Sequence, residues 1–70
     1  MSDHDQRWWV DCGDPFGRDR SVTVLVEEDQ VLVVAPPGGT AVLSAQQTHR
    51  LHRTLGTASD AAAETGDPRG

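Results

Sequence analysis

Two short apolar runs with an acidic link between them restrict this chain to very few folds. Residues 22–26 and 31–35 are rich in valine, a β-branched residue that fits the pleated surface of a sheet. The link, residues 27–30, is short and polar, and this arrangement is typical of an antiparallel β-hairpin. Because successive residues of a strand face opposite sides, this hairpin carries apolar side chains on both faces. Both faces therefore need cover from the rest of the chain or from a second chain.

The segments on either side of the hairpin predict further strands. Residues 36–39 read Pro-Pro-Gly-Gly, which favours a tight turn because proline presets φ and glycine accepts a positive φ. We therefore expect residues 40–43 to form a third, short strand that pairs with residues 31–35. Upstream, residues 7–11 predict a fourth strand, and residues 13–20, which contain a proline and two glycines, form the loop that joins it to the hairpin.

A helix is expected after these strands. Ser44 and Gln47 have the spacing of a capping box, and helix-forming residues continue through Leu55. Gly56 stands where a helix commonly stops, and Leu51 lies one turn before Leu55, so the helix has an apolar stripe that faces the sheet. The sequence thus predicts an α+β fold, in which a small three- to four-stranded antiparallel sheet is followed by one C-terminal amphipathic helix.

The length of the chain and the composition of its ends indicate the domain organisation. A chain of 70 residues and 7.5 kDa holds at most one small domain, which we place at residues 7–56. Residues 1–6 and 57–70 are polar and acidic and have little to bury, so we expect both to be disordered. The longest wholly apolar run, residues 31–35, is far shorter than the roughly 18 residues of a membrane-spanning helix. The first residues do not resemble a secretory signal, and we expect a cytoplasmic protein.

The sequence offers few groups for catalysis or for binding a cofactor. Cys12 is the only cysteine, which excludes an intramolecular disulfide and a zinc-binding cysteine pair. Asp11 and Asp14 beside it raise the pKa of the thiol and oppose its use as a nucleophile. His49 and His52 are spaced i, i+3 and could approach one metal ion. A metal site also needs a third and a fourth ligand, and nothing in the sequence brings His4, Cys12 or an aspartate to these histidines. We therefore expect a non-enzymatic protein with no cofactor or metal, and keep a small accessory enzyme or metal-binding protein as the third alternative.

Positive charge collects on the predicted helix. Residues 44–56 contain Arg50, Arg53 and no acid, so the remainder of the chain carries −7 against −5 for the whole. A DNA-binding transcriptional regulator that uses helix 44–56 is therefore the main alternative function, since paired chains could present two such helices. The acidic remainder disfavours nucleic acid as the partner, because DNA-binding proteins usually carry a broad basic surface.

The adjacent pair Trp8 and Trp9 indicates a contact surface. Neighbouring strand residues face opposite sides, so one indole enters the core while the other stays outside, and tryptophan is enriched in the centre of protein interfaces. The second face of the hairpin must be covered by these tryptophans and Phe16, or by a second chain. Because so small a domain rarely buries enough apolar surface alone, we predict a homodimer that acts as a small non-enzymatic regulatory or interaction module through protein–protein contacts. Its candidate partner-binding residues are Trp8, Trp9, His49, Arg50 and Arg53.

The order of elements between residues 31 and 55 resembles a known family. The order is a valine-rich strand, a Pro-Gly turn, a short strand ending in Leu43-Ser44 and a helix ending in Leu55-Gly56. In this order the stretch resembles the BldB-like family of small actinobacterial developmental regulators. The upstream tryptophan and the single cysteine are part of the same pattern. Separately, the absence of Lys, Ile, Asn and Tyr is typical of a high-GC genome of the actinobacterial kind and carries no functional weight. The resemblance implies a homodimeric, non-enzymatic regulator associated with transcription factors. It assigns no role to single residues, because the Arg-Asp-Ser stretch expected on a family strand is absent from residues 22–26.

Overall fold

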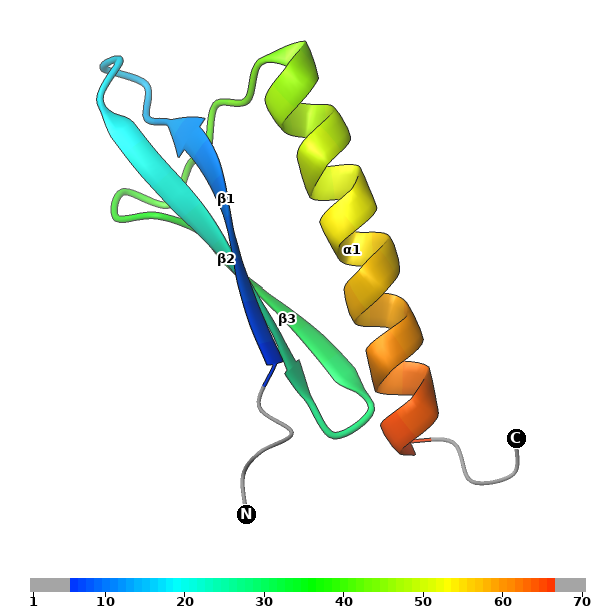
Figure 1. Cartoon of the computed structure of the whole chain (residues 1–70). Helices are drawn as coiled ribbons and strands as arrows, with labels where there is room; N and C mark the ends of the chain where they lie inside the picture. Colours follow the sequence, from blue (N-terminus) through cyan, green and yellow to red (C-terminus); the bar gives the residue numbers. More distant parts are fainter. Residues whose placement is uncertain (1–5, 67–70) are drawn as a thin grey trace.

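Residues 6–66, which the computed structural model describes, form three antiparallel strands with one long helix against one face of the sheet (Figure 1). Strand β1 spans Gln6–Gly13, β2 spans Asp19–Glu27, β3 spans Gln30–Val34, and helix α1 spans Ala45–Gly66. The strand order is β1-β2-β3, so β1 and β3 are the two edges. The predicted α+β fold is confirmed. Of the termini predicted to be disordered, residues 1–5 and 67–70 lie outside the described part, and Gln6 belongs to β1.

Strands β2 and β3 form the predicted hairpin. Glu27 pairs with Gln30, so the connection consists of the two residues Glu28 and Asp29. Glu28 has a φ of 58°, in the left-handed region that tight hairpin turns use. The acidic link of residues 27–30 therefore closes the hairpin as its position predicted.

The two flanking strands that the sequence predicted have different outcomes. The strand expected over residues 7–11 is confirmed and is longer, since all of β1 pairs with β2. The short strand expected over residues 40–43 is wrong: Val42 makes a single bridge to Gly13, with both N···O distances at 2.8 Å. Both glycines of the turn at residues 36–39 have positive φ, and the chain crosses to the outer edge of β1 instead of returning along β3. The helix begins three residues later, which leaves room for only one residue pair.

Helix α1 begins where the capping box predicted. The Ser44 N–H donates a hydrogen bond to Gln47 Oε1 at 2.9 Å, and the Gln47 N–H donates to Ser44 Oγ at 3.1 Å. These two bonds satisfy backbone donors that the first turn of a helix otherwise leaves unpaired.

The predicted end of the helix at Gly56 is wrong, and so is the disordered tail as far as residue 66. Helix α1 continues without interruption through residues 57–66. Ala58 is fully buried and Ala62 is 5% exposed, because both continue the apolar stripe that the two leucines of the first half began. Alanine is the strongest helix former, and its small side chain lets the helix lie close to the sheet. The folded domain therefore reaches ten residues beyond the predicted boundary at residue 56.

The core lies between α1 and one face of the sheet. The central strand contributes Val22, Val24 and Val26, which alternate with less buried residues as a strand with one covered face requires. Leu51 and Leu55 of α1 pack against this core, as their spacing predicted. The fully or nearly buried residues of the core cluster are Cys12, Val22, Val24, Val26, Ala58 and Ala62.

The interior position of Gly56 leads to a stability prediction. A glycine inside a helix costs about 1 kcal/mol relative to alanine, and a methyl group at Gly56 would meet no heavy atom within 4 Å beyond its own stretch of helix. We expect Gly56→Ala to raise the free energy of unfolding by about 1 kcal/mol and the Tm by roughly 4–8 °C, as measured by circular dichroism. The control is Gly38→Ala, which should lower the Tm because Gly38 has a φ of 95°. An unchanged or lower Tm for Gly56→Ala would contradict a continuous helix.

Candidate interaction surfaces

The face of the sheet opposite α1 has a partly exposed, largely apolar centre, and strand alternation places the polar residues Arg7, Ser21 and Glu27 around it. Its residues, which together are named the open face, are Trp9, Thr23, Leu25, Leu32 and Val34. The register sets Trp9, Thr23 and Val34 side by side across the three strands, with Leu25 beside Leu32 in the next row. Trp9 is 63% exposed and Val34 is 47% exposed. Contiguous apolar surface of this kind marks an interaction site more often than an ordinary surface.

A small hollow lies at the row of the sheet next to the row that contains Trp9. Its volume is about 130 Å³, and Arg7, Leu25 and Leu32, which form one row of the sheet register, line it together with Glu27. The open face therefore carries a projecting aromatic ring and, one row away, a small depression with leucine walls.

The loop between β1 and β2 leaves the open face uncovered. Phe16, one of the residues expected to cover it, is 80% exposed, and its ring centroid lies 5.4 Å from the guanidinium carbon of Arg18. Asp14 organises this loop: its Oδ1 accepts hydrogen bonds from the backbone N–H groups of Phe16 and Arg18, both at 2.9 Å. Asp14 Oδ2 lies 3.5 Å from Nε of Arg20. The sequence identifies Asp14 only as a neighbour of the cysteine, whereas the structure shows it to be the one buried charged residue among residues 6–66.

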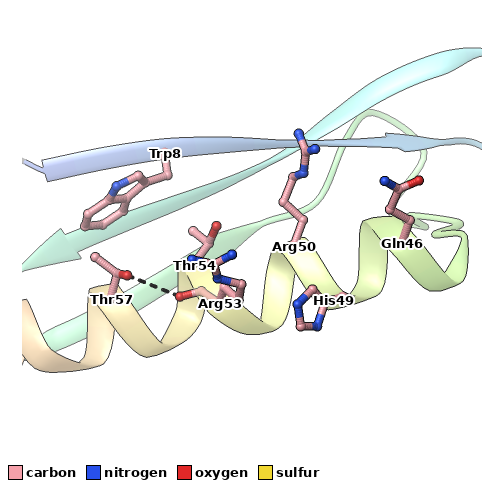
Figure 2. Close-up of a pocket in the computed structure, with 7 residues that line it drawn as sticks. All are labelled: Trp8, Gln46, His49, Arg50, Arg53, Thr54 and Thr57. Carbon is pink, nitrogen blue, oxygen red and sulfur yellow. Dashed lines mark hydrogen bonds between the residues drawn. The ribbon is translucent and has the colours of Figure 1, made fainter.

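A second surface, the β1–α1 groove, lies on the other side of the sheet. It is a cavity of about 350 Å³ between strand β1 and one flank of the helix (Figure 2). Its lining residues are Trp8, Gln46, His49, Arg50, Arg53, Thr54 and Thr57. Gln46 and Arg50 also line a neighbouring cavity of about 210 Å³ that reaches Asp11, so the hollow continues along β1.

Side chains of both elements determine the chemistry of the β1–α1 groove. The half-buried Trp8 packs against the core and forms the apolar wall, across from Thr54 and Thr57 (Figure 2). Figure 2 shows Arg50 extending from α1 toward β1. Arg50 and Arg53 are exposed and have no ion pair with any residue between 6 and 66, whereas Arg18 and Arg20 lie against Asp14. The groove is therefore electropositive on its helix side and aromatic on its strand side.

The five candidate partner-binding residues fall on two surfaces. Trp8, His49, Arg50 and Arg53 meet in the β1–α1 groove, while Trp9 lies on the open face. The prediction that the two indoles face opposite sides, one toward the core and one outward, is confirmed. Whether these residues bind a partner stays a prediction. The sequence prediction did not include Thr54 and Thr57. Their signal is that Thr54 lies four residues after Arg50 and Thr57 four residues after Arg53, although Thr57 falls beyond the expected end of the helix.

Cys12 is a core residue. Its side chain is buried in the cluster beneath α1. Burial is the largest cause that raises the pKa of its thiol, and the negative charge of Asp11 adds to the effect. A thiol with a raised pKa stays protonated at neutral pH, so Cys12 behaves as a small hydrophobic residue and not as a nucleophile.

His49 and His52 lie side by side on the exposed part of α1. Their ring centroids are 6.4 Å apart and the rings are inclined by 28°. Among the described residues, no group of three or more His, Cys, Asp or Glu side chains is close enough together to hold a metal ion. His4, another potential ligand, lies outside the described residues.

Neither family nor fold similarity adds a functional assignment. No family model, curated protein or solved structure matches this chain, so the BldB-like resemblance stays a prediction. Within residues 6–66, no helix combines the length and the apolar character needed to cross a membrane.

Proposed function

We propose that this protein is a small, non-enzymatic regulatory module that acts through protein–protein contacts and forms a homodimer through the open face. The observation that carries the proposal is the row of Trp9, Thr23 and Val34, in which Trp9 and Val34 are exposed apolar side chains, on the face of the sheet that α1 does not cover. Leaving a tryptophan and two part-exposed leucines in water is unfavourable, and a second copy of the chain supplies the missing cover.

The shape of the open face supports self-association. A two-fold symmetric interface uses the same patch on both copies, so a projection on that patch must fit a depression on the same patch. Trp9 projects from one row of the sheet, and the hollow between Leu25 and Leu32 lies in the adjacent row. A two-fold axis between these rows places the indole of each copy over the hollow of the other.

The area of the open face predicts a weak dimer. Three strands about 4.8 Å apart and about seven residues long give a footprint of roughly 350 Å² on each copy. Both copies together then bury less than the ~1,200 Å² at which stable complexes begin. We therefore expect a dissociation constant on the order of 10 µM, so the fraction of dimer changes with protein concentration in this range.

The dimer is tested by sedimentation equilibrium between about 1 µM and 1 mM protein, a range that brackets the expected dissociation constant. The wild-type chain of 7.5 kDa should move from monomer toward twice that mass. Trp9→Thr should raise the dissociation constant about 1,000-fold, because each dimer loses two indoles at roughly 2 kcal/mol apiece. Threonine keeps the strand, since it is a good β former.

The matched control for this test removes another exposed aromatic ring, from a different surface. Phe16→Ser, in the loop between β1 and β2, should leave the dissociation constant within about twofold, because Phe16 lies off the open face. Two results would contradict the proposal: a wild-type chain that stays monomeric and folded at about 1 mM, or a Trp9→Thr variant that associates like the wild type.

A further inference from the structure

We propose that the β1–α1 groove is a binding site for an extended acidic segment of a partner protein, which pairs with the free edge of β1 and places carboxylates against Arg50 and Arg53. This site lies on the opposite side of the sheet from the open face, and it is a surface for a second, different protein. The proposal combines the backbone of an edge strand with the charge of the helix beside it.

The outer edge of β1 has backbone groups available for pairing. In an antiparallel strand, the N–H and C=O of one residue point to the same side, and this side alternates along the chain. The N–H and C=O of Gly13 both point outward, because both bond to Val42 at 2.8 Å. The same groups of Asp11, Trp9 and Arg7 therefore also point outward, and among residues 6–66 they have no backbone partner on that side. A free edge of this kind accepts an added strand.

The charge beside this edge selects an acidic segment. Arg50 and Arg53 lie one helical turn apart on the flank of α1 that faces β1, and neither forms an ion pair with a carboxylate among the described residues. Every second side chain of an added strand points to the side of the sheet that α1 covers, and these side chains are roughly 6.8 Å apart. This spacing is comparable to the distance between two side chains one turn apart on a helix. Carboxylates at alternate positions of the segment therefore match the two guanidinium groups.

The remaining walls define the rest of the recognition pattern. Trp8 offers an indole face to an apolar side chain next to the acidic pair, and Thr54 lies across the groove from it. Asp11 lies near the other end of β1, and its negative charge disfavours an acidic side chain of the bound segment at that end. The expected segment is therefore apolar beside Trp8, acidic at two alternate positions beside the arginines, and neutral toward Asp11.

Nucleic acid fits this groove less well. The chain has a formal charge of −5, and the tip of the hairpin exposes Glu27, Glu28 and Asp29. A long row of phosphates would meet this negative field, whereas a short acidic segment in the groove would meet mainly the two arginines. Single-stranded DNA is therefore included in the experiment as the competing occupant.

The experiment measures binding of a short, end-blocked, fluorescein-labelled peptide in which glutamate alternates with valine and threonine. The full chain should bind it, and binding should weaken roughly tenfold between about 0.05 and 0.5 M NaCl. The same peptide with glutamine in place of glutamate should bind at least tenfold more weakly. In the complex, hydrogen exchange at the amides of Arg7, Trp9 and Asp11 should slow, which reports pairing along the β1 edge.

Matched variants separate the groove from general charge effects. Arg50→Ala combined with Arg53→Ala should weaken peptide binding about 30-fold, because two charge-assisted contacts are lost. Arg18→Ala, which removes a positive charge from the loop between β1 and β2, should change binding less than threefold. Val34→Lys, on the open face of β3, should weaken the dimer and leave peptide binding intact, so failure of one proposal does not imply failure of the other.

Three results would overturn the acidic-peptide site. The first is equal binding of the glutamate and glutamine peptides, and the second is peptide binding that is insensitive to the paired arginine substitutions. The third is tighter binding of single-stranded DNA than of the peptide, with the same loss in the arginine variant, which would assign the groove to nucleic acid.

Discussion

Replacing Ala58 with Asp is expected to unfold the domain. Ala58 is fully buried beneath the central strand, in the same cluster as Val24. A carboxylate at that position has no cation in the core cluster, and burying an unpaired charge costs several kcal/mol. A domain of this size has only about 3–5 kcal/mol of stability from its core, so the variant should lack cooperative unfolding in circular dichroism and urea titration.

The control for this prediction introduces the same side chain on the same helix. Ala63 is exposed, so Ala63→Asp adds the same charge and a similar helix-propensity cost without burying the carboxylate. This variant should stay folded and lose less than about 1 kcal/mol in the free energy of unfolding. If residues 57–66 were a disordered tail, both substitutions would be harmless. Equal stability of the two variants would therefore contradict the extended helix.

Removing the carboxylate of Asp14 is expected to give the second-largest loss of stability. Its Oδ1 accepts two backbone hydrogen bonds at 2.9 Å, and its Oδ2 lies beside Nε of Arg20, which is buried without a hydrogen-bond partner. Asp14→Ala leaves two loop N–H groups without their acceptor and the part-buried guanidinium of Arg20 without its ion-pair partner. We expect a loss of about 3 kcal/mol in the free energy of unfolding, measured by urea titration.

Asp14→Asn separates the hydrogen bonds from the charge. The asparagine Oδ1 can keep both backbone hydrogen bonds, while the attraction to Arg20 and to Arg18 is lost. We therefore expect Asp14→Asn to lose about 1 kcal/mol, roughly a third of the alanine effect. If both variants lose the same amount, the ion pairs, and not the loop hydrogen bonds, stabilise this turn.

The two proposed surfaces can operate together, because they lie on opposite sides of one sheet. A dimer formed through the open face leaves both β1–α1 grooves accessible. Two acidic segments of one partner would then bind at effective concentrations in the millimolar range, which strengthens binding well beyond that of a single groove. A weak dimer could thereby gain affinity from its partner, since a ligand that binds only the dimer stabilises it.

Features that depend on neighbouring residues could be predicted from the sequence. The hairpin follows from two valine-rich runs and a short acidic link, and the helix start follows from Ser44 and Gln47. The opposite orientation of Trp8 and Trp9 follows from strand alternation alone. Each of these features is determined by residues that are adjacent or close together in the sequence, so no contact between distant segments is needed to predict it.

The rest was decided by packing between distant segments. Gly56 reads locally as a stop, but Ala58 and Ala62 gain burial against β2 only if the helix continues. Likewise, Val42 bridges Gly13 because the chain after the hairpin crosses to the far edge of β1. The local conformational propensities of these residues do not predict that path. The β1–α1 groove is likewise formed by distant segments, since Trp8 of β1 lines it together with residues of the helix. Apolar burial at about 25 cal/mol per Å² outweighs the roughly 1 kcal/mol that one helical glycine costs, and it is a property of the folded chain, not of any segment alone.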